Sequence, residues 1–363
     1  METHDYASIE TLKDLLSAKS IADVDAILKK LPIPPEEAAY FDVNDKTPWP
    51  AGVLRWVPVG LQRGNAGRIK LANSGENPLA ERLVNGMEAL IELARHREAA
   101  KDPNIAAPAS PRAAAKRYFE IRPLDQISHK RSDPEWKRAR AMAAKLRLKL
   151  QTFRNKSGNH FTVRIEDDGI GQAPDRVHRT LLSLSESSKG DKPYLIGLFG
   201  QGGSSAFQAS EVSIVLSRRA PDLLEDEVDG VGWSIIRQIF QKGRRDPYFA
   251  YLAISADGAV PRFSAQVADA AGVNHGTTFT HIDYDFQRKG SAVSKGLWTA
   301  LNHLLFNPIL PFELYALRDT ADPVWGHGYR LTGNTNKLRE KQSIDFIDKH
   351  FGAQHVTLPE GNV

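Results

Sequence analysis

A strand-like run that ends in two acids and two glycines places the tightest constraint on the fold of this chain. Residues 163–172 read VRIEDDGIGQ, in which apolar and charged side chains alternate up to Asp167. Alternation of this kind is typical of a strand with one buried face, and the glycines that follow indicate a backbone turn. The stretch therefore predicts a strand that ends in a carboxylate, followed by a backbone left open at Gly169 and Gly171.

Composition narrows the class of protein. The chain has 363 residues, of which 41% are hydrophobic and 25% charged, as in an ordinary globular protein of one large or two smaller domains. It has no cysteine, which excludes disulfides, thiolate zinc sites and cysteine nucleophiles, and a cytoplasmic location is expected. No apolar run reaches the roughly 18 residues of a membrane helix, so no membrane partner is expected.

The sequence pattern changes several times along the chain, and no internal repeat is present. Apolar residues at helical spacing, strand-like alternation and loops rich in glycine or proline distinguish successive stretches. We expect a helical stretch at 8–31, two strands within 53–73, a helix at 77–100, a strongly basic stretch within 101–160, strands separated by glycine-rich loops from 161, and a helical, turn-rich end at 291–363.

The helix predicted over residues 77–100 carries a polar stripe. Glu81, Asn85 and Glu88 are four and three residues apart, so their side chains project from one helical face. Two interpretations stay open: a solvated stripe on an amphipathic helix, or a set of oxygen ligands, since an asparagine carbonyl binds hard cations. The apolar residues expected to pack the other side are Leu83, Val84, Met87, Leu90 and Ile91.

A glycine-rich stretch, IGLFGQGGSSAFQAS at residues 196–210, precedes a predicted helix start at Ser204. Backbone N–H groups in such a loop can bind an anion, phosphate above all. The stretch lacks the Gly-Lys-Ser/Thr of a Walker A loop and the downstream acid of a dinucleotide fingerprint. It is a weak signal by itself, because hairpin loops have a similar composition.

Four motifs in order resemble those of the GHKL ATPase superfamily, the Bergerat-fold proteins that include gyrase B subunits, histidine kinases, heat-shock chaperones, MutL and MORC proteins. In the style of its motifs the chain is most similar to the ATPase domains of heat-shock chaperones, MutL and MORC proteins. The resemblance covers roughly residues 53–286 and includes a Ser188-Lys189 pair like those in the lids of MutL and MORC proteins. The motifs are E-x-x-x-N-x-x-E-A at 81–89, D-x-G-x-G at 167–171, G-x-x-G-x-G-G at 197–203 and HGTTFTHI at 275–282.

The resemblance implies a fold and a domain organisation. The implied fold class is α+β, a two-layer sandwich in which a mixed, largely antiparallel sheet is covered by helices on one face. The implied organisation is a helical N-terminal extension at 1–50, an ATP-binding domain at 51–290 with a basic insertion at 101–160 and an ATP lid at 172–196, and a C-terminal segment at 291–363 that begins a transducer-like region.

The resemblance also implies a role for each motif residue. Asp167 would accept a hydrogen bond from the exocyclic amine of adenine, because an ionised carboxylate only accepts. Asn85 would complete the shell of a Mg²⁺ ion, and Glu81 would orient or deprotonate the attacking water. The further ATP-binding residues implied are Glu88, Gly169, Gly171, Ser188, Lys189, Gly197, Gly200, Gln201, Gly202, Gly203, Ser204 and Thr277.

The implied activity is Mg-dependent ATP binding and slow hydrolysis that close the lid and drive homodimerisation or engagement of a protein partner. The alternative is an ATP-gated interaction module with little hydrolysis, and the presence of Glu81 favours hydrolysis. A role in a bacterial nucleic-acid-linked or antiviral defence system is an analogy at the level of the fold. The sequence departs from the family pattern at Glu88, where an aspartate is usual, and a γ-phosphate lysine is assigned to no residue, with Lys337 and Arg339 as candidates.

The segment at residues 112–156 is strongly basic, with fourteen lysines and arginines against four acids. Residues 134–154 are predicted to form one amphipathic helix with Trp136 and Phe153 on its inner side. Two interpretations stay open: contact with the phosphate backbone of DNA or RNA, or a solvated surface that pairs with acids elsewhere, such as those at 221–230.

Overall fold

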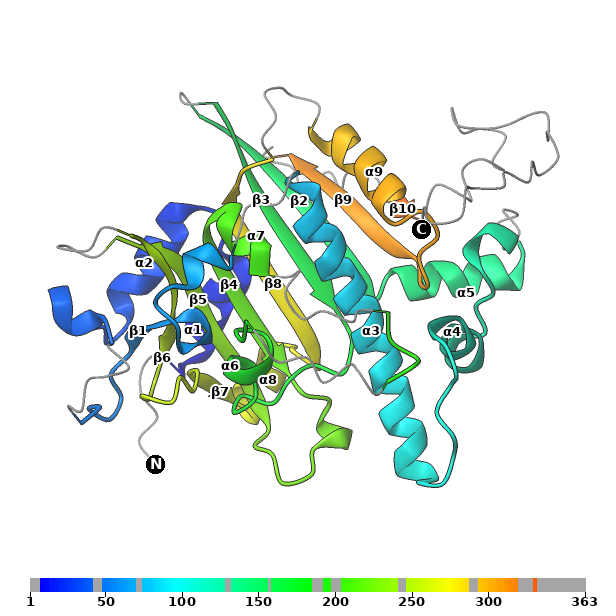
Figure 1. Ribbon diagram of the computed structural model, residues 1–363, viewed down its shortest axis with the longest axis horizontal. Helices are drawn as coiled ribbons and strands as arrows, with labels where there is room; N and C mark the ends of the chain where they lie inside the picture. Colours follow the sequence, from blue (N-terminus) through cyan, green and yellow to red (C-terminus); the bar gives the residue numbers. More distant parts are fainter. Residues whose placement is uncertain are drawn as a thin grey trace, which may run out of the picture.

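A mixed, mostly antiparallel sheet forms the centre of the molecule (Figure 1). The strands follow the order β1-β6-β5-β4-β8-β3-β2-β9-β10, with β7 paired to β5. β2 and β9 run parallel, whereas the other strand pairs that are described run antiparallel. The computed structural model describes residues 7–41, 48–69, 74–127, 132–155, 158–184, 192–196, 204–240, 246–286, 293–318 and 329–331.

Runs of helices and runs of strands follow one another along the chain, and the sheet is mostly antiparallel, which makes this an α+β protein, as predicted. The strands are β1 (Arg55–Pro58), β2 (Leu146–Asn155), β3 (Gly158–Asp167), β4 (Ser210–Arg218), β5 (Gly230–Ile239), β6 (Tyr248–Ala253), β7 (Arg262–Ser264), β8 (Gly276–Tyr284), β9 (Phe312–Arg318) and β10 (Tyr329–Leu331). The helices are α1 (Ile9–Ser17), α2 (Ile21–Lys30), α3 (Glu76–Lys101), α4 (Pro111–Phe119), α5 (Pro134–Ala143), α6 (Val177–Thr180), α7 (Ser205–Gln208), α8 (Ala265–Ala270) and α9 (Val293–Leu304).

Helix α3 confirms the helix predicted at 77–100 and crosses one face of the sheet over β2 and β3 (Figure 1). Pro78 lies in its first turn, where the missing N–H breaks no helical hydrogen bond. Apolar residues of α3 such as Leu83 and Leu90 are buried against Leu148 and Ile165 of the two strands. This packing fixes α3 over the end of β3, where Asp167 stands.

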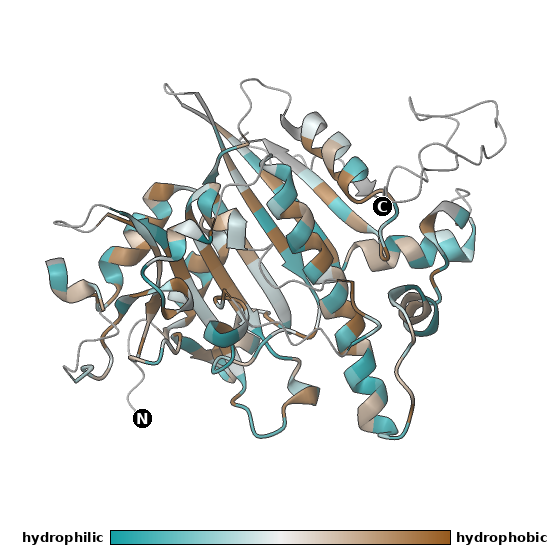
Figure 2. Ribbon diagram, viewed as in Figure 1, coloured by the Kyte–Doolittle hydropathy of each residue, from teal (hydrophilic) through white to brown (hydrophobic). Residues whose placement is uncertain are grey.

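Helices cover both faces of the sheet, and the prediction of one helical layer is wrong on this point. α1, α2 and α8 pack on the face opposite α3, where Leu12 and Leu15 meet Ile214 and Trp233. The physical reason lies in β4 and β5, which are buried on both faces and carry hydrophobic stretches (Figure 2): Ile214 and Trp233 pack on one side and Val215 and Ile236 on the other. A strand of that kind needs cover on both sides to leave water.

The single helix predicted over 134–154 is also wrong. α5 ends at Ala143 and the chain turns into β2 at Leu146. From there leucine alternates with lysine, arginine or glutamine, and a period of two places the leucines toward α3 and the charges on the opposite face. Strand pairing to β3 and β9 therefore prevails over the helical pattern that precedes it.

Two further stretches differ from the sequence expectation. Within 53–73 the first strand is β1, but the described residues of the second, 67–69, form the end of a 3-10 turn (Asn65–Gly67) and a bend instead of a strand. The described part of 291–363, expected to be helical and turn-rich, contributes α9 and also the strands β9 and β10 that extend the sheet. In the part of the chain that the structure describes, helices lack an apolar stretch long enough to cross a membrane.

Candidate functional site

The middle of α3 packs directly on the end of β3, which brings two of the predicted motifs together. A Cβ added at Gly86 would stand only 2.4 Å from Cδ1 of Leu146 in β2 and 3.4 Å from the Cβ of Asp167, so a glycine lets the helix approach these strands closely. One turn later, the carbonyl of Ala89 accepts a hydrogen bond from Ile170 N at 3.0 Å. The conformation after the strand is therefore fixed by the helix that carries Glu81 and Asn85.

Asp167 occupies this junction on the α3 side of the sheet. Its Oδ1 accepts a hydrogen bond from Gly169 N at 3.0 Å, and it pairs in register with Thr277 of β8. Burial raises the pKa of Asp167 to about 7, although hydrogen bonds from the backbones of Gly169 and Thr277 oppose the shift. A carboxyl with this pKa changes between donor-acceptor and pure acceptor near neutral pH.

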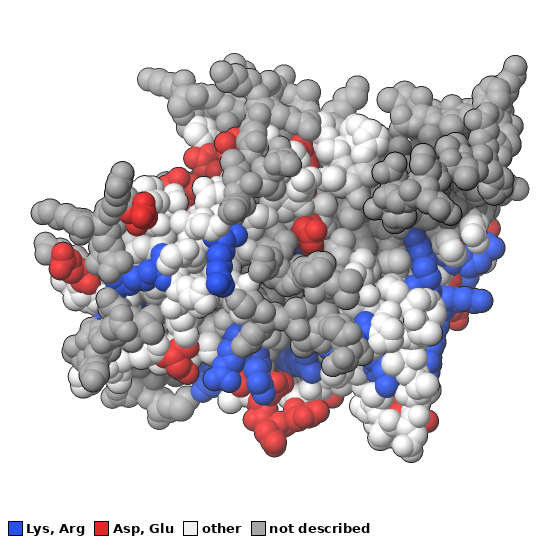
Figure 3. Space-filling model, viewed as in Figure 1, with Lys and Arg blue, Asp and Glu red and all other residues white. Residues whose placement is uncertain are grey.

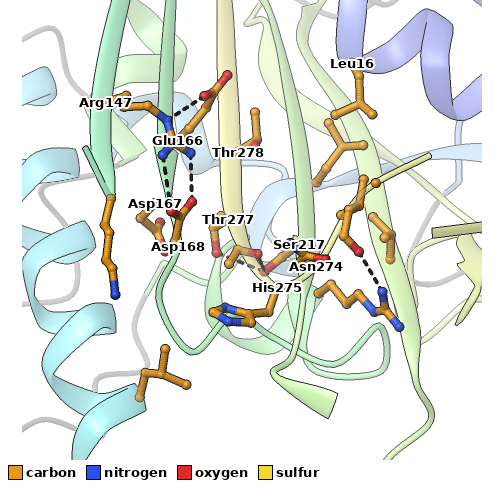
Figure 4. A pocket seen from close by; sticks show the side chains of 18 of the residues that line it. Leu16, Arg147, Glu166, Asp167, Asp168, Ser217, Asn274, His275, Thr277 and Thr278 are labelled. Atoms are coloured by element: carbon orange, nitrogen blue, oxygen red, sulfur yellow. Dashed lines mark hydrogen bonds and ion pairs between the residues drawn. The ribbon is translucent and has the colours of Figure 1, made fainter. Parts of the chain in front are cut away.

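The neighbouring acid has a different environment, as the alternation of the strand predicts. Asp168 leaves 42% of its side chain exposed and pairs with Arg147 Nη2 at 2.7 Å. Arg147 also contacts Glu166 at 3.1 Å, on the sheet face opposite α3 (Figure 4). The charge of Asp168 is thus compensated by a guanidinium, whereas Asp167 has backbone donors alone among its hydrogen-bond partners that the structure gives.

The glycines of the turn are required by close backbone packing. Gly171 has a φ of +63°, and a Cβ there would collide with the carbonyl of Arg218 on β4. Gly276 has a φ of +110°, and a Cβ there would collide with the carbonyl of Asp167. His275 Nδ1 lies 2.8 Å from the carbonyl of Gly169 and ties the same turn to β8. The open backbone expected at this position is present, and it allows the ends of β3 and β4 and the start of β8 to pack against one another.

A cavity of about 540 Å³ opens at these strand ends (Figure 4). Asp167 and Thr277 contribute to its wall, together with Ser217, whose Oγ lies 2.9 Å from the Thr277 hydroxyl and accepts a hydrogen bond from Gln172 N at 2.9 Å. The wall continues to the opposite face of the sheet, where Arg147 and Glu166 lie. The polar end of the cavity thus collects residues from β3, β4 and β8.

The polar stripe on α3 does not form one solvated surface. Glu81 is exposed and Asn85 half-buried, but Glu88 is only 2% exposed. Glu88 Oε1 accepts a hydrogen bond from Ile196 N at 2.7 Å, directly before the glycine-rich stretch. The solvated-stripe interpretation is therefore wrong at Glu88, because this carboxylate holds the segment that leads into the third motif.

Several implied ATP-binding residues lie outside the described residues. They are Ser188, Lys189, Gly197, Gly200, Gln201, Gly202 and Gly203, as are the candidate cations Lys337 and Arg339. Ser204 is described and forms the N-cap position of α7. No cluster of three or more histidines or acids that could hold a metal is found among the described residues. A magnesium ion here would thus depend on Asn85, on ligand oxygens and on water.

Sequence reasoning missed Arg82, which is 7% exposed and lies on the sheet-facing side of α3. Its Cζ stands 3.6 Å from the ring centroid of Phe279 and 5.2 Å from that of Phe207 in α7. The available signal was its spacing: Arg82 is three or four residues from Leu79 and Gly86, on the stripe that must face the sheet. A charged residue on an inward stripe is uncommon.

The basic segment is divided among α4, α5 and β2, and many of its charges have acidic partners. Arg117 pairs with Glu98 at 2.7 Å, Arg122 Nε with Glu135 at 2.7 Å, and Lys149 with Glu166 at 2.7 Å. Three of the acids at 221–230, Asp222, Glu227 and Asp229, pair instead with arginines outside the segment, namely Arg97, Arg176, Arg218 and Arg219. Figure 3 shows basic and acidic side chains side by side along the lower edge of this face.

The comparisons with protein families and with curated proteins found no match for this chain. No protein-family model matches the chain, and no curated protein matches its sequence. Three elements far apart in sequence nevertheless meet at one place: the middle of α3, the end of β3 with the start of β8, and the residues before α7.

Proposed function

We propose that this chain is a GHKL-type ATPase domain, with a Bergerat-like arrangement of α3 over the sheet, that binds Mg-ATP and hydrolyses it slowly. The observation that carries the proposal is the contact of the E-x-x-x-N helix with the D-x-G-x-G turn. Gly86 and Ala89 of the first motif pack on Asp167 and Gly169 of the second. Glu88 in addition accepts a hydrogen bond from Ile196, directly before the third.

Asp167 would read the base. An ionised carboxylate accepts hydrogen bonds and donates none, so it favours the amine of adenine over the carbonyl of guanine. The half-buried position and the polar neighbours Ser217 and Thr277 suit a purine edge, which is flat and carries polar atoms. The raised pKa of Asp167 follows from its burial, and an amine donor would lower it again on binding.

The chemistry would take place along the outer side of α3. The amide oxygen of Asn85 would bind the magnesium ion, which when bound neutralises phosphate charge. Glu81, one turn away and exposed, would orient the attacking water and accept its proton. Because Glu81 and Asn85 serve different steps, we expect Glu81→Ala to retain ATP without turnover and Asn85→Ala to lose Mg-dependent binding.

Closure of a lid over 172–196 would follow nucleotide binding and drive dimerisation or the engagement of a protein partner. The hydrogen bond from Ile196 to Glu88 supports this, since it links the end of that segment to the helix that carries the proposed catalytic residues. A second candidate is a nucleotide-gated module with little hydrolysis. The exposed carboxylate of Glu81 favours hydrolysis, because a module that only binds has no use for a base at this position.

Calorimetry with ATP and GTP in the presence of Mg²⁺ tests the proposal. We expect ATP to bind at least tenfold more tightly than GTP, and Asp167→Asn to reduce that preference. Glu10→Ala, an exposed acid on α1, serves as a matched control for substitutions of acids. Equal affinity for the two nucleotides, or no binding of either, would show that the proposal is wrong.

A further inference from the structure

Arg82 is a buried cation without a hydrogen-bond partner among the described residues. Its Nε and Nη2 atoms are both closed to solvent and have no hydrogen-bond acceptor within the described ranges. The guanidinium stacks on Phe279 and stands near Phe207, two aromatic rings that offer no oxygen acceptor. Burial without a charged partner lowers the pKa of Arg82 to about 9.

Other arginines of this chain use the same two nitrogens to bind a carboxylate. Arg97 bonds Asp222 through Nε at 2.7 Å and Nη2 at 2.9 Å. Arg218 bonds Asp229 in the same manner, with both distances 2.9 Å. The Nε and Nη2 hydrogens form one edge of the guanidinium, and that edge matches two oxygens of a carboxylate or a phosphate. In Arg82 this edge is free.

The fold by itself does not require a guanidinium here. A buried, unpaired charge is unfavourable, and an apolar side chain of similar size would pack on Phe279 without that penalty. His281, the next residue of β8 on the same side, also has an unpartnered buried nitrogen, Nε2, while its Nδ1 lies 2.8 Å from Ser213 Oγ. Two unsatisfied polar groups at one place indicate a polar ligand.

The position of Arg82 identifies the class of ligand. Phe279, on which it stacks, is two residues beyond Thr277, the register partner of Asp167, so Arg82 and Asp167 lie on the same side of the sheet. Arg82 is also adjacent to Glu81 in α3 and three residues before Asn85. We propose, resting on the proposed function, that Arg82 binds the polyphosphate of the nucleotide through its Nε–Nη2 edge.

This assignment gives the proposed phosphate site a cation from α3, the helix that also carries Glu81 and Asn85. The edge is closed to solvent, so the guanidinium has to rotate off Phe279, or α7 has to move, when the phosphate arrives. Nucleotide binding then exchanges an aromatic stack for two charged hydrogen bonds. Arg82 therefore gains its acceptor only with ligand present, and it is a phosphate-binding residue whose presence destabilises the free protein.

The test compares Arg82→Met and Arg82→Lys with the wild type in Mg²⁺, using calorimetry with adenosine, ADP and ATP. We expect Arg82→Met to reduce ATP affinity at least tenfold and to leave adenosine affinity within twofold. The same variant should raise the melting temperature of the free protein, because it removes an unpaired buried charge. Arg82→Lys keeps the charge but not the two-nitrogen edge and should retain intermediate affinity. Arg122→Met removes an arginine paired with Glu135, far along the chain, and should change no nucleotide affinity.

Two outcomes separate this inference from the proposed function. An ATP-to-adenosine affinity ratio that is the same in Arg82→Met and the wild type, with a lower melting temperature in the variant, would make Arg82 a structural residue and overturn the inference. The wild-type protein could instead bind inorganic tripolyphosphate, in a manner that depends on Arg82, without binding adenosine. That result would support an anion site at Arg82 and would show that the proposed nucleotide function is wrong.

Discussion

The basic segment and the region under α3 differ in how their charged groups are compensated. In the basic segment, arginines such as Arg117 and Arg122 stand beside glutamates, partly in water. Under α3, Arg82 has no ion-pair partner in the part of the chain that the structure describes, and the carboxyl of Asp167 accepts its hydrogen bonds from backbone donors. Exposed ion pairs contribute little to folding, whereas buried unpaired charges oppose it. We therefore propose the functional site under α3 and not in the segment with the larger net charge.

The largest effect is expected from the outer side of α3. Glu81→Ala should reduce ATP turnover by about 10²–10⁴-fold, the usual contribution of a general base, while ATP affinity stays within about twofold. Phosphate release under saturating Mg-ATP measures the first quantity and calorimetry the second. Glu10→Ala is the control, because this acid is also exposed in a helix but lies in α1. Wild-type turnover in Glu81→Ala would show that Glu81 is not the general base.

The next effect concerns the stability of the junction itself. Gly171→Ala should lower the free energy of unfolding by about 3 kcal/mol, since a left-handed φ is combined with a collision against the Arg218 carbonyl. Gly272→Ala is a matched control with a similar φ of +73° and open space around it, and should cost about 1 kcal/mol. Chemical denaturation measures both. Equal losses would show that the turn is not packed as described.

A smaller effect, the pH dependence of the free energy of unfolding, also distinguishes the two regions. The pKa of Asp167 is about 7 in the folded protein and near 3.8 in an unfolded chain, so the folded state holds the proton more tightly. This group therefore stabilises the fold at acidic pH, and its contribution is lost as the pH rises toward and through 7. Asp167→Asn should flatten the dependence of unfolding free energy on pH between about 4 and 8, whereas Arg122→Met should leave it unchanged.

The same titration should appear in ligand binding. The ionised form of Asp167 is the better acceptor for an adenine amine, so ATP affinity should rise between pH 6 and 8, with proton release at the lower pH. A lost hydrogen bond to a charged group costs about 1–3 kcal/mol, which sets the size expected for Asp167→Asn at pH 8. Calorimetry in two buffers of different ionisation enthalpy measures the released protons. Proton uptake instead of release would contradict the assigned role.

The smallest effect is expected in the basic segment. Reversing the exposed basic residues Lys116, Lys137 and Arg138 to glutamate should change the free energy of unfolding by about 0.5 kcal/mol or less each and leave ATP turnover unaltered. If the segment contacts DNA or RNA, the triple variant should lose duplex affinity in a salt-dependent manner. Anisotropy at ~0.15 M salt decides the question, because screening there removes weak surface attraction.

Local pattern determined much of the fold in advance. The alternation before Asp167 predicted β3, the spacing of Leu83, Leu90 and their neighbours predicted α3, and the strands expected from residue 161 include β3, β4, β5, β6 and β8. These features depend on periods of two and 3.6 residues, which any short stretch displays by itself. The candidate residues Glu81, Asn85 and Asp167 were found in the same manner, because motif spacing is also a local property.

Tertiary structure decided the rest. Whether Glu88 faces water or Ile196, whether 146–155 is helix or strand, and whether Arg82 has a partner all depend on residues distant in sequence. A helical stripe specifies which side chains point inward, but the groups that they meet come from whichever strands pack beneath. For Arg82 those are Phe279 and Phe207, rings without acceptors, and for Asp167 they are backbone N–H groups. Charge can be read from the sequence, whereas the compensation of charge exists only in the folded chain.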